Sequence, residues 1–163
     1  MINPFFKNHG PYSIDKLLKL SDINNNKNYT KIKIFDIKDL GTATKDNISF
    51  FHSKKYELFA SITKASFCIT TINLSGILPK TCNKIIVDNV LIETAKITKI
   101  FYPEAVTDDF DSSVKYINKT SFKTKVKFGE NVLIGKNVKI GKNCLIGHNS
   151  IIESNVVIGS NCS

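Results

Sequence analysis

The segment FGENVLIGKNVKIGKNCLIG, residues 128–147, repeats one pattern every six residues. A bulky residue such as Ile134 is followed by glycine, and a smaller residue such as Val132 stands two positions before it. Asparagine recurs six times without a gap, at positions 131, 137, 143, 149, 155 and 161. Counted in both directions from this segment, a bulky residue occupies positions 116, 122, 128, 134, 140, 146, 152 and 158.

This period predicts a short strand and a tight turn in every hexapeptide. Residues two apart on a strand point to the same side, so the bulky and the small residue fill one narrow interior. Asparagine and glycine supply turn conformations with positive φ, which β-branched residues resist. Hexapeptide repeats of this kind are typical of parallel β-helices, whereas a sandwich of short strands would not keep the register. Ile117 and Lys123 replace glycine in the first units, as expected of a capping repeat, and Glu153 replaces it later.

The first hundred residues have a different character. Residues 13–20 have apolar side chains at helical spacing, with Ser13 as a plausible N-cap. Further helices are expected from Tyr56 onward and over 90–101, and strands are expected over 32–37, 48–51, 66–70 and 84–88. The sequence therefore predicts a small α/β domain at residues 1–102 and an incomplete β-helix of two to three coils at 103–163.

Charge and composition exclude several classes of function. The net charge is +9 and all 23 basic residues are lysine. Because no arginine is present for bidentate contacts to bases, we expect no nucleic-acid partner, and most lysines to be solvated. No apolar stretch approaches the ~20 residues of a membrane span. The N-terminus shows no secretory signal, so the sequence indicates a cytoplasmic protein.

The cysteines and histidines do not form a metal-binding pattern. The four cysteines contain no CxxC pair, and the three histidines lie far from them in the sequence. We expect no metal and free thiols. Cys144 and Cys162 lie 18 residues apart, one coil if three hexapeptides make a turn, and we expect both to be packed in the interior as small apolar residues.

The order of the modules adds a resemblance. Ile48-Ser49-Phe50, then Ser53-Lys54-Lys55-Tyr56, and then the hexapeptides resemble the UDP-3-O-acylglucosamine N-acyltransferase family. This resemblance implies left-handed coils of three hexapeptides, a homotrimer and no cofactor. It also implies transfer of a 3-hydroxyacyl chain from acyl carrier protein to the 2-amine of UDP-3-O-acylglucosamine in lipid A biosynthesis.

The resemblance also implies a binding site for the uracil ring. Phe50 and Tyr56 match the aromatic pair that sandwiches uracil in the family, although the local pattern by itself would make them core residues. Ser53 stands where the family usually has asparagine, and Lys54 where it has proline. A serine hydroxyl cannot offer an amide's paired donor and acceptor, so the contact to the base is expected to be weaker or rearranged. Lys54 and Lys55 either approach the diphosphate or stay solvated.

Two other functions remain open. One is a hexapeptide acetyltransferase that uses acetyl-CoA, although residues 1–102 carry no Rossmann glycine fingerprint. The other is a non-catalytic β-helical binding or assembly protein. His148 lies in an Ile-Gly-His-Asn setting like that of the family's catalytic histidine, but it is expected to be a solvent-facing turn residue on an early coil. We therefore expect this chain to bind UDP-sugar without being catalytic. The acyl chain length, and whether the chain is natural or cut, stay open.

Overall fold

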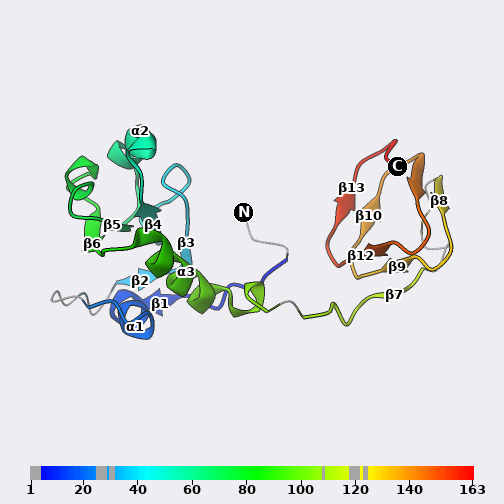
Figure 1. The fold of residues 1–163 in the computed structure, drawn as a ribbon, viewed down its shortest axis with the longest axis horizontal. Coiled ribbons are helices and arrows are strands. Elements are labelled where there is room, and N and C mark those ends of the chain that lie inside the picture. Colours follow the sequence, from blue (N-terminus) through cyan, green and yellow to red (C-terminus); the bar gives the residue numbers. More distant parts are fainter. Residues whose placement is uncertain (1–4, 25–28, 30–31, 108, 118–121, 123–124) are drawn as a thin grey trace. The chain divides into compact units, whose positions relative to one another are not determined.

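The computed structural model describes residues 5–24, 29, 32–107, 109–117, 122 and 125–163. It divides into two compact units, one over residues 6–107 and one that contains residues 108–163 (Figure 1). Among the described residues no helix is long and apolar enough to cross a membrane.

The N-terminal unit is built on a four-stranded parallel sheet in the order β3-β4-β5-β6. Its strands are β3 (Asp36–Ile37), β4 (Asn47–Phe51), β5 (Phe67–Thr70) and β6 (Asn83–Ile86). A short antiparallel pair, β1 (Tyr12–Ser13) and β2 (Lys33–Ile34), lies outside this sheet. The helices are α1 (Ile14–Leu20), α2 (Glu57–Ser61) and α3 (Val90–Phe101), with 3-10 turns η1 (Lys54–Tyr56), η2 (Ser75–Ile77) and η3 (Pro103–Ala105).

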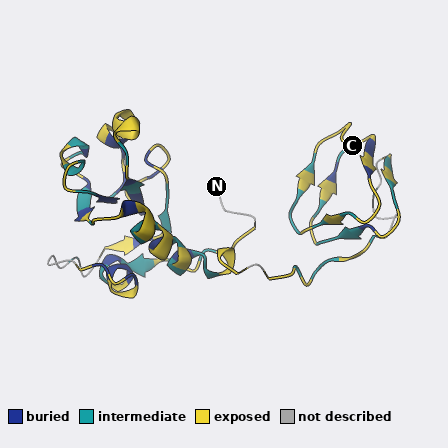
Figure 2. Ribbon diagram, in the orientation of Figure 1, coloured by how far each residue is buried: buried dark blue, intermediate teal, exposed yellow. Residues whose placement is uncertain are grey.

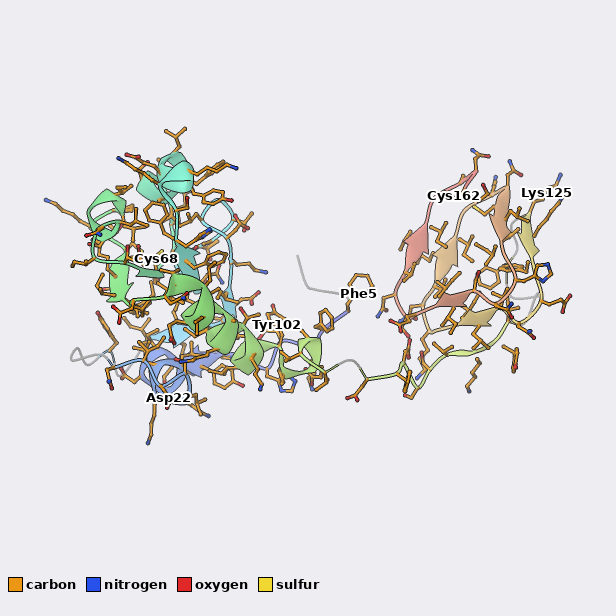
Figure 3. All side chains as sticks on the ribbon, in the orientation of Figure 1. Phe5, Asp22, Cys68, Tyr102, Lys125 and Cys162 are labelled. Atoms are coloured by element: carbon orange, nitrogen blue, oxygen red, sulfur yellow. The ribbon has the colours of Figure 1, made fainter. Side chains whose placement is uncertain are left out.

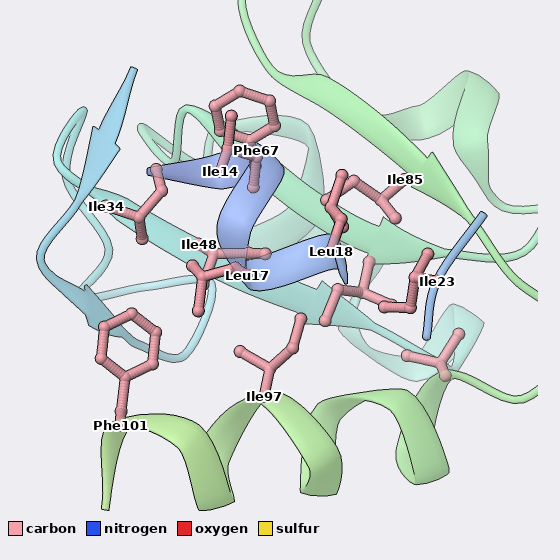
Figure 4. Close-up of a cluster of buried hydrophobic side chains, with 12 residues drawn as sticks. Ile14, Leu17, Leu18, Ile23, Ile34, Ile48, Phe67, Ile85, Ile97 and Phe101 are labelled. Carbon is pink, nitrogen blue, oxygen red and sulfur yellow. The ribbon is translucent and has the colours of Figure 1, made fainter. Parts of the chain in front are cut away.

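Both faces of the two central strands are covered, as parallel sheets require. On one face Ile48 and Phe67 pack against α1 and α3, through side chains such as Leu17 and Ile97 (Figure 4). On the other face a second cluster collects around Phe51; its buried members are Leu40, Ala43, Phe51, Ala60, Ala65, Cys68, Leu78 and Cys82. Every residue of β5 is buried, which explains its uninterrupted apolar and small-residue sequence. In contrast, the short helix α2 is mostly exposed (Figure 2).

Most of the expected elements form in this unit, with two differences. The helix at 13–20 is confirmed, and the Ser13 hydroxyl accepts a hydrogen bond from the Lys16 amide at 3.3 Å. The strand expected over 32–37 is divided at the half-exposed Phe35, because β2 pairs with β1 whereas β3 pairs with β4. The helix expected from Tyr56 ends at Ser61, just before the β-branched Ile62 and Thr63.

The C-terminal unit is a stack of coils whose strands pair in parallel with partners 18 residues away. Strand β8 (Val126–Phe128) pairs with β11 (Cys144–Ile146). Strand β9 (Leu133–Ile134) pairs with β12 (Ile151–Ile152), and β10 (Lys139–Ile140) pairs with β13 (Val157–Ile158). Three hexapeptides therefore make one coil, as the family resemblance implies.

The interior of the coils is filled by the two residues of each hexapeptide that the pattern predicts. Its buried members are Val132, Ile140, Cys144 and Ile146, with neighbouring bulky positions partly buried around them. The prediction was wrong for the first unit, however. Tyr116 is 77% exposed, and its strand β7 (Lys115–Tyr116) pairs antiparallel with β9. Among the described strands, the regular coil therefore begins at β8.

Asparagine and glycine have different roles at the corners of the coils. Only asparagine supplies positive φ, whereas the sequence predicted positive φ for both residues. All six repeat asparagines have φ between 57° and 65°, and no glycine in the described part has a positive φ. The glycines are required by close approach instead. A Cβ on Gly135 would lie 2.5 Å from the Ser154 amide nitrogen of the next coil, and one on Gly129 equally close to that of His148.

The uncrowded corners explain the exception at Glu153. A Cβ on Gly147 would meet nothing nearer than 3.9 Å, and one on Gly159 nothing nearer than 4.0 Å. Glu153 lies between them in the same row and is exposed. The corner position thus demands glycine only where another coil lies against it.

Side chains also connect each corner to the next coil. The Nδ1 atom of His148 accepts a hydrogen bond from the Glu130 amide at 2.8 Å. The hydroxyls of Ser154 and Ser160 accept from the amides 18 residues earlier, at 3.1 Å each. Asparagine side chains form a parallel series, in which Asn131, Asn137 and Asn143 each donate to the asparagine one coil later. His148 therefore shares a hydrogen-bonding position with two serines.

All four cysteines are free thiols in the structure. Cys144 is buried in the coil interior, as expected, and its Sγ lies 3.0 Å from the Gly159 carbonyl oxygen. Cys162, on the outermost coil (Figure 3), is exposed, so the expectation of an interior position was wrong for this residue. No described strand packs over it.

The close approach of coils predicts a contrast between two glycines. Gly135→Ala should destabilise the C-terminal unit by about 1–3 kcal/mol, because its Cβ would overlap the backbone of the next coil. Gly147→Ala should be neutral or slightly stabilising, since the space is open and alanine restricts the unfolded chain. Amide hydrogen exchange over residues 125–162 measures both. Equal destabilisation by the two variants would contradict the close-approach explanation.

The corner hydrogen bond predicts a second contrast, at His148. His148→Ala should lower the stability of the coils by about 1 kcal/mol, because the Glu130 amide loses its acceptor. His148→Ser should retain most of that stability, since serine accepts the equivalent bond at 154 and 160. The same exchange experiment compares them. If alanine and serine variants are as stable as the parent chain, His148 has no structural role at this corner.

Candidate functional site

A cavity of about 340 Å³ lies at the carboxyl ends of β3 and β4. In open parallel sheets, ligands bind outside the carboxyl ends of the strands, where loops diverge from a rigid framework. The loop after β3 and the residues at the end of β4 both contribute side chains here. The lining residues are Asp39, Leu40, Gly41, Phe50, His52, Tyr56 and Phe59.

Three aromatic rings form a row along this cavity. Phe50 and His52 are two residues apart at the end of β4 and so project to the same side. Their ring centroids are 6.3 Å apart with an interplanar angle of 25°. The Tyr56 ring, at the end of η1, lies 5.4 Å from His52 at 47°. The imidazole is therefore a neighbour of both other rings.

The turn that brings Tyr56 back to the strand is capped by Ser53. The Ser53 hydroxyl accepts a hydrogen bond from the Lys55 amide at 3.4 Å, and its carbonyl oxygen accepts one from the Tyr56 amide at 3.0 Å. Lys54 and Lys55 are exposed on this turn. Neither lysine forms an ion pair with a residue that the structure describes. Two unneutralised cations thus stand on the turn that ends at the cavity.

The opposite wall is a loop held by Asp39. Its Oδ1 atom accepts hydrogen bonds from the Gly41 and Thr42 amides at 2.9 Å and 3.0 Å, and its Oδ2 atom accepts one from the Thr42 hydroxyl. These bonds, chiefly that from the Thr42 hydroxyl, lower the pKa of Asp39. The carboxylate is therefore charged at neutral pH and fixes the loop that carries Leu40 and Gly41.

The structure brings together part of the residue set expected from the sequence. Phe50, which is half-buried, and Tyr56, which is exposed, both line the cavity. Ser53 and Lys54 lie on the adjoining turn and do not line it. His148 belongs to the coils of the C-terminal unit, where it is bonded to a backbone amide. Within the described ranges, no group of three or more His, Cys, Asp or Glu side chains could hold a metal ion.

The sequence predicted Phe50 and Tyr56 but not the other five lining residues, Asp39, Leu40, Gly41, His52 and Phe59. His52 could have been found, because it follows Phe50 by two positions, directly after the end of β4, and so continues the strand's alternation. Asp39 and Phe59 could not, since their approach to β4 depends on how the loop after β3 and the helix α2 fold back. The cavity is an aromatic, mostly apolar concavity with cations beside it, which suits a flat ring attached to an anionic group.

The N-terminal unit matches a known family. Residues 31–100, which include the whole cavity, match the family model for UDP-3-O-(3-hydroxymyristoyl) glucosamine N-acyltransferase, LpxD. Residues 125–160 match the bacterial transferase hexapeptide model of six repeats. The hexapeptide family implies that the coils form a left-handed β-helix.

Curated relatives agree with these matches. The chain is 35% identical over 100 residues to the UDP-3-O-acylglucosamine N-acyltransferase of Rickettsia prowazekii (strain Madrid E). It is 34% identical over 100 residues to the enzymes of the same name from Rickettsia canadensis (strain McKiel) and Rickettsia felis (strain ATCC VR-1525 / URRWXCal2). Each alignment covers 60% of this chain and 29% of the relative. The N-terminal segment is thus similar to UDP-3-O-acylglucosamine N-acyltransferases, and the C-terminal segment is similar to bacterial transferase hexapeptide repeats.

Proposed function

We propose that this chain binds the uridine diphosphate part of UDP-3-O-acylglucosamine at the cavity lined by Phe50, His52 and Tyr56. It does so as part of an enzyme that moves a 3-hydroxyacyl chain from acyl carrier protein to the 2-amine of that sugar in lipid A synthesis. The observation that carries this proposal is the row of aromatic rings at the carboxyl end of β4, inside the segment that matches the family.

The chemistry of the cavity supports a pyrimidine nucleotide as ligand. A base stacked on an aromatic side chain gains about 1–3 kcal/mol, and the face of the ring tolerates a flat, weakly polar partner. A volume of about 340 Å³ suits one base with part of its ribose. Lys54 and Lys55 on the turn beside the cavity attract the diphosphate as point charges.

The chemical step requires a general base for the attacking amine. The resemblance to the family assigns this base to a histidine on a later coil, which removes a proton as the amine attacks the acyl thioester. His148 is not suited to that role, because its Nδ1 atom accepts the Glu130 amide proton and so holds the ring in a corner hydrogen bond. We infer that the full-length enzyme is a homotrimer and that the present chain binds substrate without transferring the acyl group.

Binding of UDP-N-acetylglucosamine tests the first part of the proposal. Titration calorimetry should show saturable binding to the chain, and Phe50→Ala and Tyr56→Ala should each weaken it roughly 5- to 100-fold. Tyr56 is the cleaner variant, since Phe50 also packs against the core. Tyr116→Ala, an exposed aromatic residue in the coils, is the matched control and should bind normally. Saturable binding of coenzyme A without binding of the UDP-sugar would favour an acetyl-CoA-dependent transferase instead.

Turnover tests the second part. The purified chain, given 3-hydroxyacyl-acyl carrier protein and UDP-3-O-acylglucosamine, should release no free carrier thiol above the rate without protein. His148→Ala should therefore change stability and leave this background rate unchanged. Measurable transfer that disappears in His148→Ala would contradict the corner assignment and make His148 the general base.

A further inference from the structure

His52 is a polar side chain of the cavity with unused hydrogen-bonding capacity. Its imidazole is stacked with Phe50 and tilted relative to Tyr56, and its nitrogen atoms make no hydrogen bond with any residue that the structure describes. The side chain is exposed and lines the cavity. A neutral imidazole carries one donor and one acceptor, so both remain available to a ligand.

Apart from the Tyr56 hydroxyl, which is carried by a stacking ring, the polar side chains Ser53 and Asp39 near the cavity are already engaged. The Ser53 hydroxyl accepts the Lys55 amide proton at the start of η1, which leaves it one donor on a turn outside the lining. Both oxygens of Asp39 accept hydrogen bonds from its own loop. Neither group offers the unengaged donor and acceptor that His52 offers beside the aromatic rings.

We infer that His52 supplies the hydrogen bond to the edge of the pyrimidine base that the cavity holds. This inference rests on the proposed function. A base that stacks on Phe50 and Tyr56 would lie close to the imidazole, because the His52 ring centroid is 6.3 Å from that of Phe50 and 5.4 Å from that of Tyr56. The edge of uracil presents carbonyl acceptors on either side of an N–H donor, and imidazole can serve either kind of group through its choice of tautomer.

The inference also accounts for the serine at position 53. A hydroxyl on a capping turn cannot present a donor and an acceptor side by side to a base. With His52 two residues beyond Phe50, the polar contact moves from the turn to the residue that directly follows the strand. The end of β4 would then position both the stacking ring and the hydrogen-bonding ring.

The test is binding of UDP to the full chain by titration calorimetry, with His52→Phe as the main variant. Phenylalanine keeps a flat ring in the row and removes both nitrogen atoms, so binding should weaken about tenfold. His52→Ala should weaken it at least as much. His9→Phe makes the same chemical change elsewhere in the same unit, where His9 pairs with Glu104, and should leave binding unchanged.

The outcomes separate this inference from the proposed function. If Phe50→Ala and Tyr56→Ala weaken binding but His52→Phe does not, the site stands and the role of His52 is overturned. Tighter binding by His52→Ala would show that the imidazole competes with the base for its place, and would also overturn it. A larger loss in Ser53→Ala than in His52→Phe would assign the contact to the hydroxyl. Absence of UDP binding to the parent chain would overturn both.

Discussion

The parallel pairing of β4 with β3 and β5 is the constraint on which the candidate site depends. Helices α1 and α3 cover one face of the sheet, and the cluster around Phe51 covers the other. A ligand can therefore reach these strands only where they end. The carboxyl ends of β3 and β4 lie side by side. This pairing by itself brings the Asp39 loop next to the aromatic residues that follow Ile48.

A different constraint organises the coils. Parallel pairing at an offset of 18 residues brings the backbone at Gly135 against the backbone at Ser154, and this contact excludes a Cβ atom. Asparagine takes the left-handed conformation beside each such corner, and its side chain bonds to the asparagine of the next coil. The side chains of His148, Ser154 and Ser160 accept hydrogen bonds from backbone amides that have no partner in the strand pairing.

Local patterns predicted the elements well, because they depend on interactions between near neighbours. The capping of α1 by Ser13 and the six-residue period of the strands follow from spacing, and the family resemblance added the coil length of 18 residues. The reason for glycine at the corners did not follow, since it lies in a contact with a residue 19 positions later. The exposed Tyr116 was also missed, because the hexapeptide spacing continues into a strand that pairs antiparallel.

In the candidate site, too, some residues could be predicted from the sequence and others depend on the tertiary fold. Phe50 and Tyr56 were predicted through their spacing and the family resemblance, and both line the cavity. Asp39 was not predicted, because its place in the wall follows from the pairing of β3 with β4 and from an internally bonded loop. Ser53 has a visible local task, the cap of η1, which the sequence comparison with the family did not reveal.

The most direct measurement is an amide chemical-shift titration of the isotopically labelled chain with UDP. The account predicts that the perturbed amides gather at Leu40 and Gly41 and from Phe50 to Phe59, on the two segments that line the cavity. Amides of the coils, residues 125–163, should keep their positions. Perturbations confined to the coils, or none at saturating UDP, would contradict the assignment of a nucleotide site to the carboxyl end of β4.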